Sequence, residues 1–362
     1  GWAPLHDLLA EEGFLAPMTD PDLLEEVSEV PGELAGAPLK RLDPEGRPLW
    51  VASSVASFGI LVNEPLLERY GLPEPRAWAD LAGAEMASLL PRPAVAYSRA
   101  WASGTNTRMY QIILQAYGWE EGWSLLARLA ANGRPYGGSA EAVMAVESGE
   151  VPAAIAIDFY GYEAQREFPG LRFLVPEDGT LVGGDPISLL NTSRHPEAAQ
   201  AFIEWVLSEE GQRVWLEVDR LPVKREVLSE RPDLLAAYDG LAGVRAVEFD
   251  WGRAAETYFS VALYFDSVMC DPHDSLVEAW RAVVRARSEG RISDEEFEEL
   301  ASELGRPLSW EAGGEVLEFT EEYAASINLR VRDDPEFAAE LGRLWRELAE
   351  ERYESIVERL SG

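Results

Sequence analysis

The residues best suited to bind a ligand are Ser103, Gly104, Thr105 and Asn106, which stand at the expected start of a helix. Backbone N–H groups in the first turn of a helix have no partner within the helix, and the helix dipole favours negative charge there. Gly104 lacks a Cβ, so a ligand can approach the backbone closely. Ser103 also fits a simple N-cap, which needs no ligand. This stretch therefore predicts either an anion site or a helix cap.

A second candidate stretch, residues 158–162, follows the short apolar run 151–157 and reads Asp-Phe-Tyr-Gly-Tyr. Ligands of α/β proteins bind beyond the carboxyl ends of strands. The carboxylate of Asp158 with the rings of Tyr160 and Tyr162 suits a sugar or a phosphorylated organic solute. The alternative interpretation is that the two tyrosines lie on the surface at the start of a helix.

Three further polar residues complete the predicted ligand-binding set. Ser139 follows Gly137-Gly138 at another expected helix start, Ser54 lies in an expected strand, and Asp185 follows Gly183-Gly184. Each has a plain structural alternative: a helix cap for Ser139, a partly exposed strand position for Ser54, and for the glycines before Asp185 a crossing where the backbone bends during domain closure.

The first two-thirds of the chain alternates strand and helix signals, which predicts an α/β fold. One or two strands are expected at residues 49–62, and single strands at 94–98, 151–157, 172–175 and 187–190. Helices are expected at 63–70, 103–118 and from 196. From about residue 226 only helical patterns remain, over 251–269, 272–290, 316–327 and 335–360. Ser293 opens another helix with a capping box, and Asp271 is expected to cap the helix 272–290.

Composition excludes several classes of protein. The 65 acidic and 31 basic side chains give a formal charge of −34, which repels nucleic acid and anionic lipid. Cys270 is alone, so no intrachain disulfide forms, and no apolar run is long enough to span a membrane. The nucleotide-binding, metalloprotease and serine-hydrolase motifs are missing, so we predict no catalytic residues and no cofactor.

Five segments in order resemble the extracellular solute-binding proteins of ABC importers, in the cluster of ferric-ion, phosphonate and sugar-phosphate binders. They are SFGILVNEPLLERYGLPEPRAWADL (57–81), SGTNTRMYQIILQAYGWEEGWSLLARL (103–129), GGSAEAVMAVESGEVPAAIAIDF (137–159), PEAAQAFIEWVLSEEGQRVW (196–215) and LPV (221–223). The resemblance implies a two-lobed periplasmic-binding-protein-like fold of type II, with the ligand held between the lobes.

The resemblance also implies how the chain is divided. Residues 1–90 with 182–225 would form lobe one, 91–181 lobe two, and 226–362 a helical C-terminal extension. Members of this family begin with a strand–helix–strand unit, so we expect that unit and a signal peptide upstream of the present first residue. The resemblance further implies a periplasmic or extracellular monomer, either free or anchored as a lipoprotein, that delivers solute to a permease with its ATPases.

Several ligands and functions stay open at this point. Ferric binders of this kind present paired tyrosines, which here would be Tyr160 and Tyr162, separated by Gly161, because phenolate oxygens suit Fe(III). The preferred cargo is Fe(III) with an anion, or a phosphorylated or anionic small molecule. The alternatives are a carbohydrate, a hydrolase that uses paired carboxylates, and an interaction role for the acidic helical extension.

Overall fold

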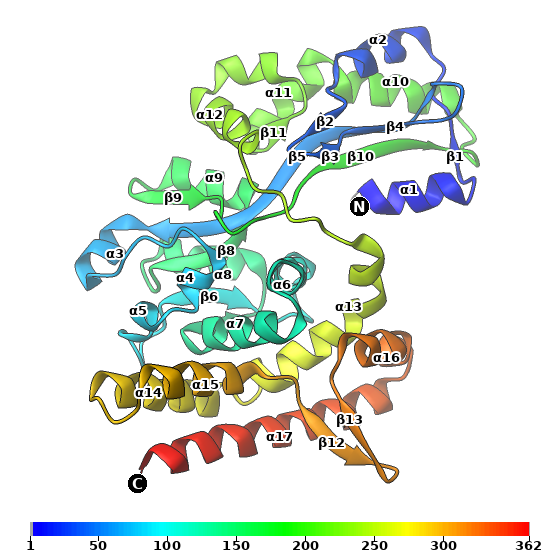
Figure 1. Cartoon of the computed structure of the whole chain (residues 1–362). Coiled ribbons are helices and arrows are strands. Elements are labelled where there is room, and N and C mark those ends of the chain that lie inside the picture. Colours follow the sequence, from blue (N-terminus) through cyan, green and yellow to red (C-terminus); the bar gives the residue numbers. More distant parts are fainter. Residues whose placement is uncertain (1–2, 362) are drawn as a thin grey trace. The chain divides into compact units, whose positions relative to one another are not determined.

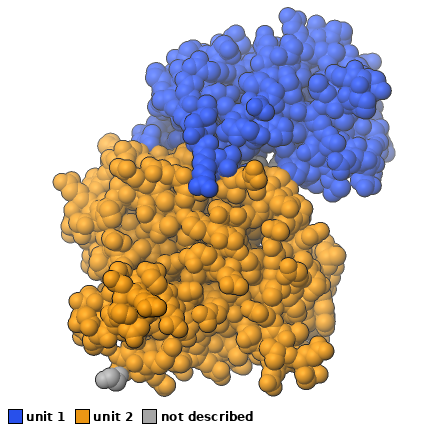
Figure 2. All heavy atoms as spheres, in the orientation of Figure 1, with its two compact units in different colours: residues 1–58, 157–167, 179–246 blue, residues 59–156, 168–178, 247–362 orange. Residues whose placement is uncertain are grey.

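The structure is a computed structural model that describes residues 3–361. Contacts divide the described chain into two compact units, coloured separately in Figure 2. Unit 1 holds residues 3–58, 157–167 and 179–246, and unit 2 holds residues 59–156, 168–178 and 247–361. The predicted lobe boundaries stay a prediction, but these units place residues 59–90 in unit 2 and residues 226–246 in unit 1.

Unit 1 is built on an antiparallel sheet. The first part of the long strand β5 (Pro48–Asn63) pairs with β10, β4 and β11, and β10 pairs in turn with β1 (Figure 1). The other strands of the unit are β1 (Leu15–Ala16), β2 (Glu33–Leu34), β3 (Ala37–Pro38), β4 (Lys40–Leu42), β10 (Val182–Leu190) and β11 (Leu221–Pro222). Its helices are α1 (Ala3–Glu11), α2 (Pro21–Glu29), α9 (Asp158–Glu167), α10 (Pro196–Leu207), α11 (Glu209–Glu217), a 3₁₀ helix (Arg225–Glu230) and α12 (Pro232–Leu241).

Unit 2 continues β5 as part of a mixed sheet. Here β5 pairs with β9 (Leu171–Leu174) and neighbours β8 (Ala153–Ile157), while β6 (Val95–Ser98) pairs in parallel with β8 and β7 (Gly133–Tyr136). The helices before residue 150 are α3 (Glu64–Tyr70), α4 (Trp78–Leu81), α5 (Ala84–Ala87), α6 (Gly104–Tyr117), α7 (Trp119–Ala131) and α8 (Ser139–Glu147). The later elements are α13 (Trp251–Phe265), a π-helix (Asp266–Cys270), α14 (His273–Ser288), α15 (Asp294–Gly305), β12 (Ser309–Ala312), β13 (Glu315–Glu318), α16 (Glu321–Asp333) and α17 (Pro335–Ser361).

Strand β5 is almost wholly buried along its 16 residues, so each of its backbone polar groups needs a partner. Pairing with β10 ends at Ser57, and pairing with β9 begins at Ile60. Between them, the N–H of Ser57 donates to the carboxylate of Asp158 at 2.7 Å, and the hydroxyl of Thr180 donates to the Phe58 carbonyl at 2.7 Å. Side chains therefore supply partners for β5 where its pairing passes from β10 to β9.

The C-terminal helices complete the core of unit 2. Tyr264 on α13 stacks on Phe319, with ring centroids 3.7 Å apart, and both rings contact Trp123 of α7 and Trp345 of α17. All four side chains are buried, and large aromatic rings bury more apolar area than any other side chains. Helix α17 runs along α14 in Figure 1. The helical region is thus continuous with the α/β core of unit 2.

Local sequence signals predicted several elements correctly. Residues 49–62 form one strand, the helix at 63–70 begins at its N-cap Asn63 and ends at the left-handed Gly71, and Ser293 forms the expected capping box.

Of the helices in residues 3–361, none combines the length and hydropathy needed to cross a bilayer.

Three predictions in the C-terminal region are wrong. Only helices were expected there, but β12 and β13 form a hairpin whose turn contains Gly313 and Gly314, both at positive φ. The expected helix at 316–327 is split, since β13 takes its first residues and α16 the rest. Asp271 is not the N-cap of α14, because the helix begins at His273 after Pro272, and its carboxylate accepts a hydrogen bond from Arg99 instead.

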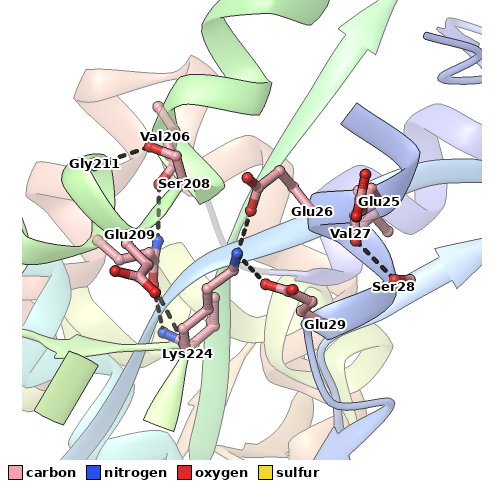
Figure 3. A network of polar contacts seen from close by, with 12 residues as sticks. Glu25, Glu26, Val27, Ser28, Glu29, Val206, Ser208, Glu209, Gly211 and Lys224 are labelled. Atoms are coloured by element: carbon pink, nitrogen blue, oxygen red, sulfur yellow. Dashed lines mark hydrogen bonds and ion pairs between the residues drawn. The ribbon is translucent and has the colours of Figure 1, made fainter. Parts of the chain in front are cut away.

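The only two lysines of the chain, Lys40 and Lys224, both bind α2. The ammonium of Lys40 donates to the carbonyls of Val27 and Val30 at the end of the helix, at 3.2 and 2.7 Å. The Lys224 side chain is 4% exposed, and its ammonium pairs with Glu26 and with Glu29 (Figure 3). A buried ammonium is tolerated only when such partners replace its water.

We expect Lys224→Met to lower the free energy of unfolding by about 2 kcal/mol, because Glu26 and Glu29 would lose their shared cation. Urea unfolding followed by fluorescence measures this change. The matched control is Arg225→Met, which breaks the exposed pair between Arg225 and Asp239 and should cost less than about 1 kcal/mol. Equal losses in the two variants would contradict the argument.

Candidate functional site

In unit 2, the predicted residues of the first stretch begin helix α6. Ser103 is the N-cap, and its hydroxyl accepts a hydrogen bond from the N–H of Asn106 at 3.1 Å. Asn106 is fully buried, and its side-chain oxygen accepts from the N–H of Ser98 at the end of β6. Gly104 is exposed and Thr105 half-buried. The first turn of α6 is therefore held in place by Asn106. It is exposed at Gly104, where the Tyr258 hydroxyl lies 3.1 Å from the position that a Cβ would take.

Ser139, which begins α8, meets Ser103 directly. The two hydroxyls share a hydrogen bond of 2.6 Å, and the side-chain amide of Asn106 donates to both hydroxyls at 3.3 Å. The structure thus brings together three of the predicted residues, Ser103, Asn106 and Ser139, from two helix starts that are 36 residues apart in the chain.

The backbone of this junction offers several free donors. Within the described chain, the N–H groups of Gly104, Thr105, Ser139 and Ala140 make no hydrogen bond. Two helix dipoles present their positive ends at the same place, since α6 and α8 both begin here. Free N–H groups with a favourable dipole are the chemistry that holds a phosphate or carboxylate.

The loop before α6 is held by the C-terminal helical region. The buried carboxylate of Asp266, in the π-helix, accepts hydrogen bonds from the N–H groups of Ala100 and Trp101 at 2.8 and 3.2 Å. Burial raises the pKa of Asp266, while Arg99 and these N–H groups oppose the shift. Trp101 itself is 57% exposed. Sequence reasoning missed Asp266, because no local pattern links it to a loop 166 residues away.

In unit 1, the predicted Asp158 is the first residue of α9 and is buried. One of its oxygens accepts from the N–H and the hydroxyl of Ser57, at 2.7 and 3.1 Å, and the other accepts from the N–H of Phe159 at 2.8 Å. Burial raises its pKa to about 7, although these three hydrogen bonds favour the carboxylate. The structure therefore gives Asp158 a clear function in supporting β5.

The two predicted tyrosines have different surroundings. The ring of Tyr160 is half-buried, with its centroid 4.5 Å from that of Phe159. Tyr162 is buried, and burial raises the pKa of its phenol well above the ordinary value, with nearby Asp158 adding to the shift. Among residues 3–361, no three His, Cys, Asp or Glu residues gather as a metal site. Tyr160 and Tyr162 as iron ligands stay a prediction.

Ser54 and Asp185 lie opposite each other on β5 and β10. The Ser54 hydroxyl donates to the Asp185 carboxylate at 3.2 Å, and the same oxygen accepts from the guanidinium of Arg220 at 2.8 Å. The Arg220 guanidinium lies 4.1 Å from the ring centroid of Phe159. Arg220 was not predicted, although it directly precedes the recognised Leu-Pro-Val segment. Its place directly before this segment was the one signal in the sequence that could have indicated Arg220.

Residues 3–241 match the family described as bacterial extracellular solute-binding protein, so this chain belongs to that family. The resemblance inferred from the five sequence segments is confirmed.

Curated relatives match over part of the chain. Over 171 residues the chain is 32% identical to the phosphoglycerate transport regulatory protein PgtC of Salmonella typhimurium. The matching segment covers 45% of this chain and 40% of PgtC. Over 235 residues it is 23% identical to the Fe(3+)-binding periplasmic protein of Serratia marcescens, covering 59% of this chain and 66% of that protein. The chain therefore spans less than half the length of PgtC.

Solved structures share the fold. The periplasmic binding protein AfuA of Actinobacillus pleuropneumoniae, solved with fructose-6-phosphate bound, gives a TM-score of 0.55 at 17% identity over 75% of this chain and 81% of that chain. The spermidine/putrescine transporter substrate-binding protein PotD of Streptococcus pneumoniae gives a TM-score of 0.55 at 16% identity, covering 72% of this chain and 80% of that one. The predicted fold class, an α/β periplasmic binding protein of two lobes, is confirmed.

Asp158 leads to a prediction about pH. Its pKa of about 7 in the folded protein lies above the value of about 4 in an unfolded chain, so the folded state holds this proton more tightly. The free energy of unfolding should therefore fall as pH rises from about 4 to about 7, and this contribution should not change further above that range.

Asp158→Asn removes that proton. We expect the difference in free energy of unfolding between wild type and variant to change by about 2 kcal/mol between pH 4.5 and 7.5 in urea titrations. Asp239→Asn is the control, because the pKa of the exposed Asp239 is lowered by Arg225 and its contribution has the opposite sign. Parallel curves for wild type and Asp158→Asn would show that Asp158 does not titrate in this range.

Proposed function

We propose that this protein is the solute-binding subunit of an ABC importer and that it captures a small phosphorylated or otherwise anionic solute. Membership of the solute-binding family supports the first part. The observation that carries the second part is the junction of α6 and α8, where Ser103 and Ser139 join two helix starts with free N–H groups.

Anion binding at this junction does not require a basic side chain. Arg99, the nearest cation in the preceding loop, is already paired with Asp271 and lies 3.6 Å from the carboxylate of Asp266. The attraction would come from backbone N–H groups and from two helix dipoles, which act at short range and are little affected by the overall charge of −34. Salt-bridging lysines are not available here, since both lysines bind α2.

The names of relatives favour the same class of cargo. PgtC is named for phosphoglycerate transport, and AfuA holds fructose-6-phosphate. Fe(III) with an anion is the second candidate, since the Serratia relative is named for Fe(3+) binding. Burial of Tyr162 disfavours iron, because a raised phenol pKa opposes the phenolate that Fe(III) needs. A neutral carbohydrate would leave the free N–H groups without a charged partner.

The setting follows from the proposal. The protein would act in the periplasm or outside the cell as a monomer, and would pass its solute to a membrane permease driven by ATPases. It would bind and release the solute unchanged, so the hydrolase alternative predicts turnover and this proposal predicts none. The prediction that one solute contacts both lobes stays a prediction.

Isothermal titration calorimetry with four probes tests the proposal: inorganic phosphate, fructose 6-phosphate, fructose and ferric citrate. We expect fructose 6-phosphate and phosphate to bind and fructose to bind at least about tenfold more weakly than fructose 6-phosphate, because one charge-assisted hydrogen bond is worth about 1.5–3 kcal/mol. Binding of fructose alone, or of ferric citrate with no response to either phosphate compound, would overturn the anionic cargo.

A pair of helix-cap variants separates binding from stability. Ser103→Ala and Ser208→Ala each remove an N-cap hydroxyl, from α6 and α11 respectively, and each should lower the free energy of unfolding by about 1 kcal/mol. Only Ser103→Ala should also weaken phosphate binding, by about fivefold or more, since its hydroxyl orients both helix starts. Equal phosphate affinities in the two variants would place the anion elsewhere.

A further inference from the structure

We propose that Arg220 gives unit 1 its own point of contact for an anionic solute, and that Asp185 positions Arg220 without contacting the solute. This inference rests on the proposed function and adds to it the residue that supplies positive charge. It also changes the sequence-based interpretation of Ser54 and Asp185, which were predicted to be ligand contacts.

The guanidinium of Arg220 is held in a fixed plane. One of its terminal nitrogens donates to Asp185 at 2.8 Å, and its central carbon lies 4.1 Å from the ring centroid of Phe159 and 5.6 Å from that of Trp215. An arginine that is paired along one edge and stacked on aromatic faces loses little conformational entropy when a ligand binds. Such an arginine is preorganised for recognition.

The rest of the guanidinium remains available. Arginine has five N–H donors, and Asp185 accepts from only one terminal nitrogen. Among the described residues, the Nε and Nη2 atoms of Arg220 have no hydrogen-bond partner, and the side chain is 27% exposed. These two nitrogens form the edge that binds phosphate or carboxylate through two parallel hydrogen bonds.

Asp185, in contrast, is already occupied. The oxygen that accepts from Arg220 also accepts from the Ser54 hydroxyl, and the main-chain carbonyl of Asp185 accepts from the Ser53 hydroxyl at 3.0 Å. The pairing of β10 with β5 is irregular between Asp185 and Pro186, which turns this short segment out of the regular register. Ser53, Ser54 and the irregular pairing thus hold Asp185 in place, and the Asp185 carboxylate in turn positions Arg220.

Strand β11 sets the place of Arg220 in the chain. Leu221 and Pro222 pair with Val55 and Ser54 on β5, so the preceding Arg220 continues this register next to Ala56. Burial raises the pKa of the Asp158 carboxyl, and repulsion from Asp185 adds to this shift. Among the described residues, Asp185 is the acidic side chain that forms an ion pair with Arg220.

The same geometry argues against a cationic solute. Aromatic rings beside a carboxylate commonly bind an ammonium group by cation–π contact. Here Arg220 already fills that position, since it lies over Phe159 and pairs with Asp185. A second cation would meet the guanidinium of Arg220 first, whereas an anion would meet its free edge.

Calorimetry on the full chain with fructose 6-phosphate, fructose, inorganic phosphate and spermidine tests this inference. We expect Arg220→Gln to weaken binding of fructose 6-phosphate and phosphate by roughly 30-fold and to flatten the salt dependence of that binding, because one charge-assisted contact is lost. Any affinity for fructose should not change, so the preference for the phosphorylated sugar should fall by the same factor. A variant that only lost stability would bind both sugars more weakly, so its preference for fructose 6-phosphate over fructose would not change.

The matched control is Arg213→Gln, which changes an exposed arginine on α11 in the same unit that pairs with Glu209 and Glu230. It should keep wild-type affinity for every probe. Asp185→Asn should weaken phosphate binding less than Arg220→Gln does, because asparagine still accepts a hydrogen bond from Arg220. Arg220→Lys, which keeps the charge, should lose affinity but keep its salt dependence, and it serves if Arg220→Gln does not fold.

The outcomes separate the inference from the function. If wild type binds none of the anionic probes, the proposed anionic cargo fails and this inference with it. If wild type binds fructose 6-phosphate and a folded Arg220→Gln keeps its affinity within about threefold, which is under about 0.7 kcal/mol, the inference fails and the function stands. Spermidine binding that Asp185→Asn abolishes would also overturn the inference.

Discussion

A buried strand that passes from one compact unit into another must find new partners for its backbone, and this constraint on β5 shapes the rest of the structure. The pairing of β5 with β10 in unit 1 ends at Ser57, and its pairing with β9 in unit 2 begins at Ile60. Asp158 and Thr180 supply the missing hydrogen bonds. At Gly59 the backbone of β9 lies so close that a Cβ would come within 2.2 Å of the Leu174 carbonyl oxygen, so no side chain fits. Asp158, which was predicted to contact the ligand, thus also stabilises β5 where the strand passes between the units.

The sequence predicted those elements whose start and end depend on residues close by in the chain. The α6 helix, its Ser103 cap and the Gly118 stop follow from local capping rules, and the structure contains all three. The hairpin of β12 and β13 was missed, although its Gly313-Gly314 pair is the usual signal for a tight turn, because the flanking acidic residues looked helical. The first boundary between the units was also not predicted, since it falls between Phe58 and Gly59 inside one unbroken apolar strand.

Long-range contacts explain the missed residues of the candidate site. Arg220 acquires its partners from β10 and α9, which are 35 and about 60 residues earlier in the chain, so no spacing pattern marks it. Asp266 looks like an ordinary acidic residue in a helix until folding brings it to the loop before α6. The meeting of Ser103 with Ser139 was likewise unforeseen as a contact, though both were chosen as helix starts. The sequence indicated which residues are candidates for the site, but it did not indicate which of them contact one another.

The placement of the two lysines has a practical consequence for chemical modification. Reagents that acylate primary amines find side-chain targets only at Lys40 and Lys224, and both hold α2. Acylation at these side chains would therefore remove the charges that fasten one helix, whereas the other ion pairs within residues 3–361 depend on arginine. Attachment of a dye or a solid support through amines would loosen α2, whereas attachment through carboxylates would meet the abundant acidic side chains of the surface.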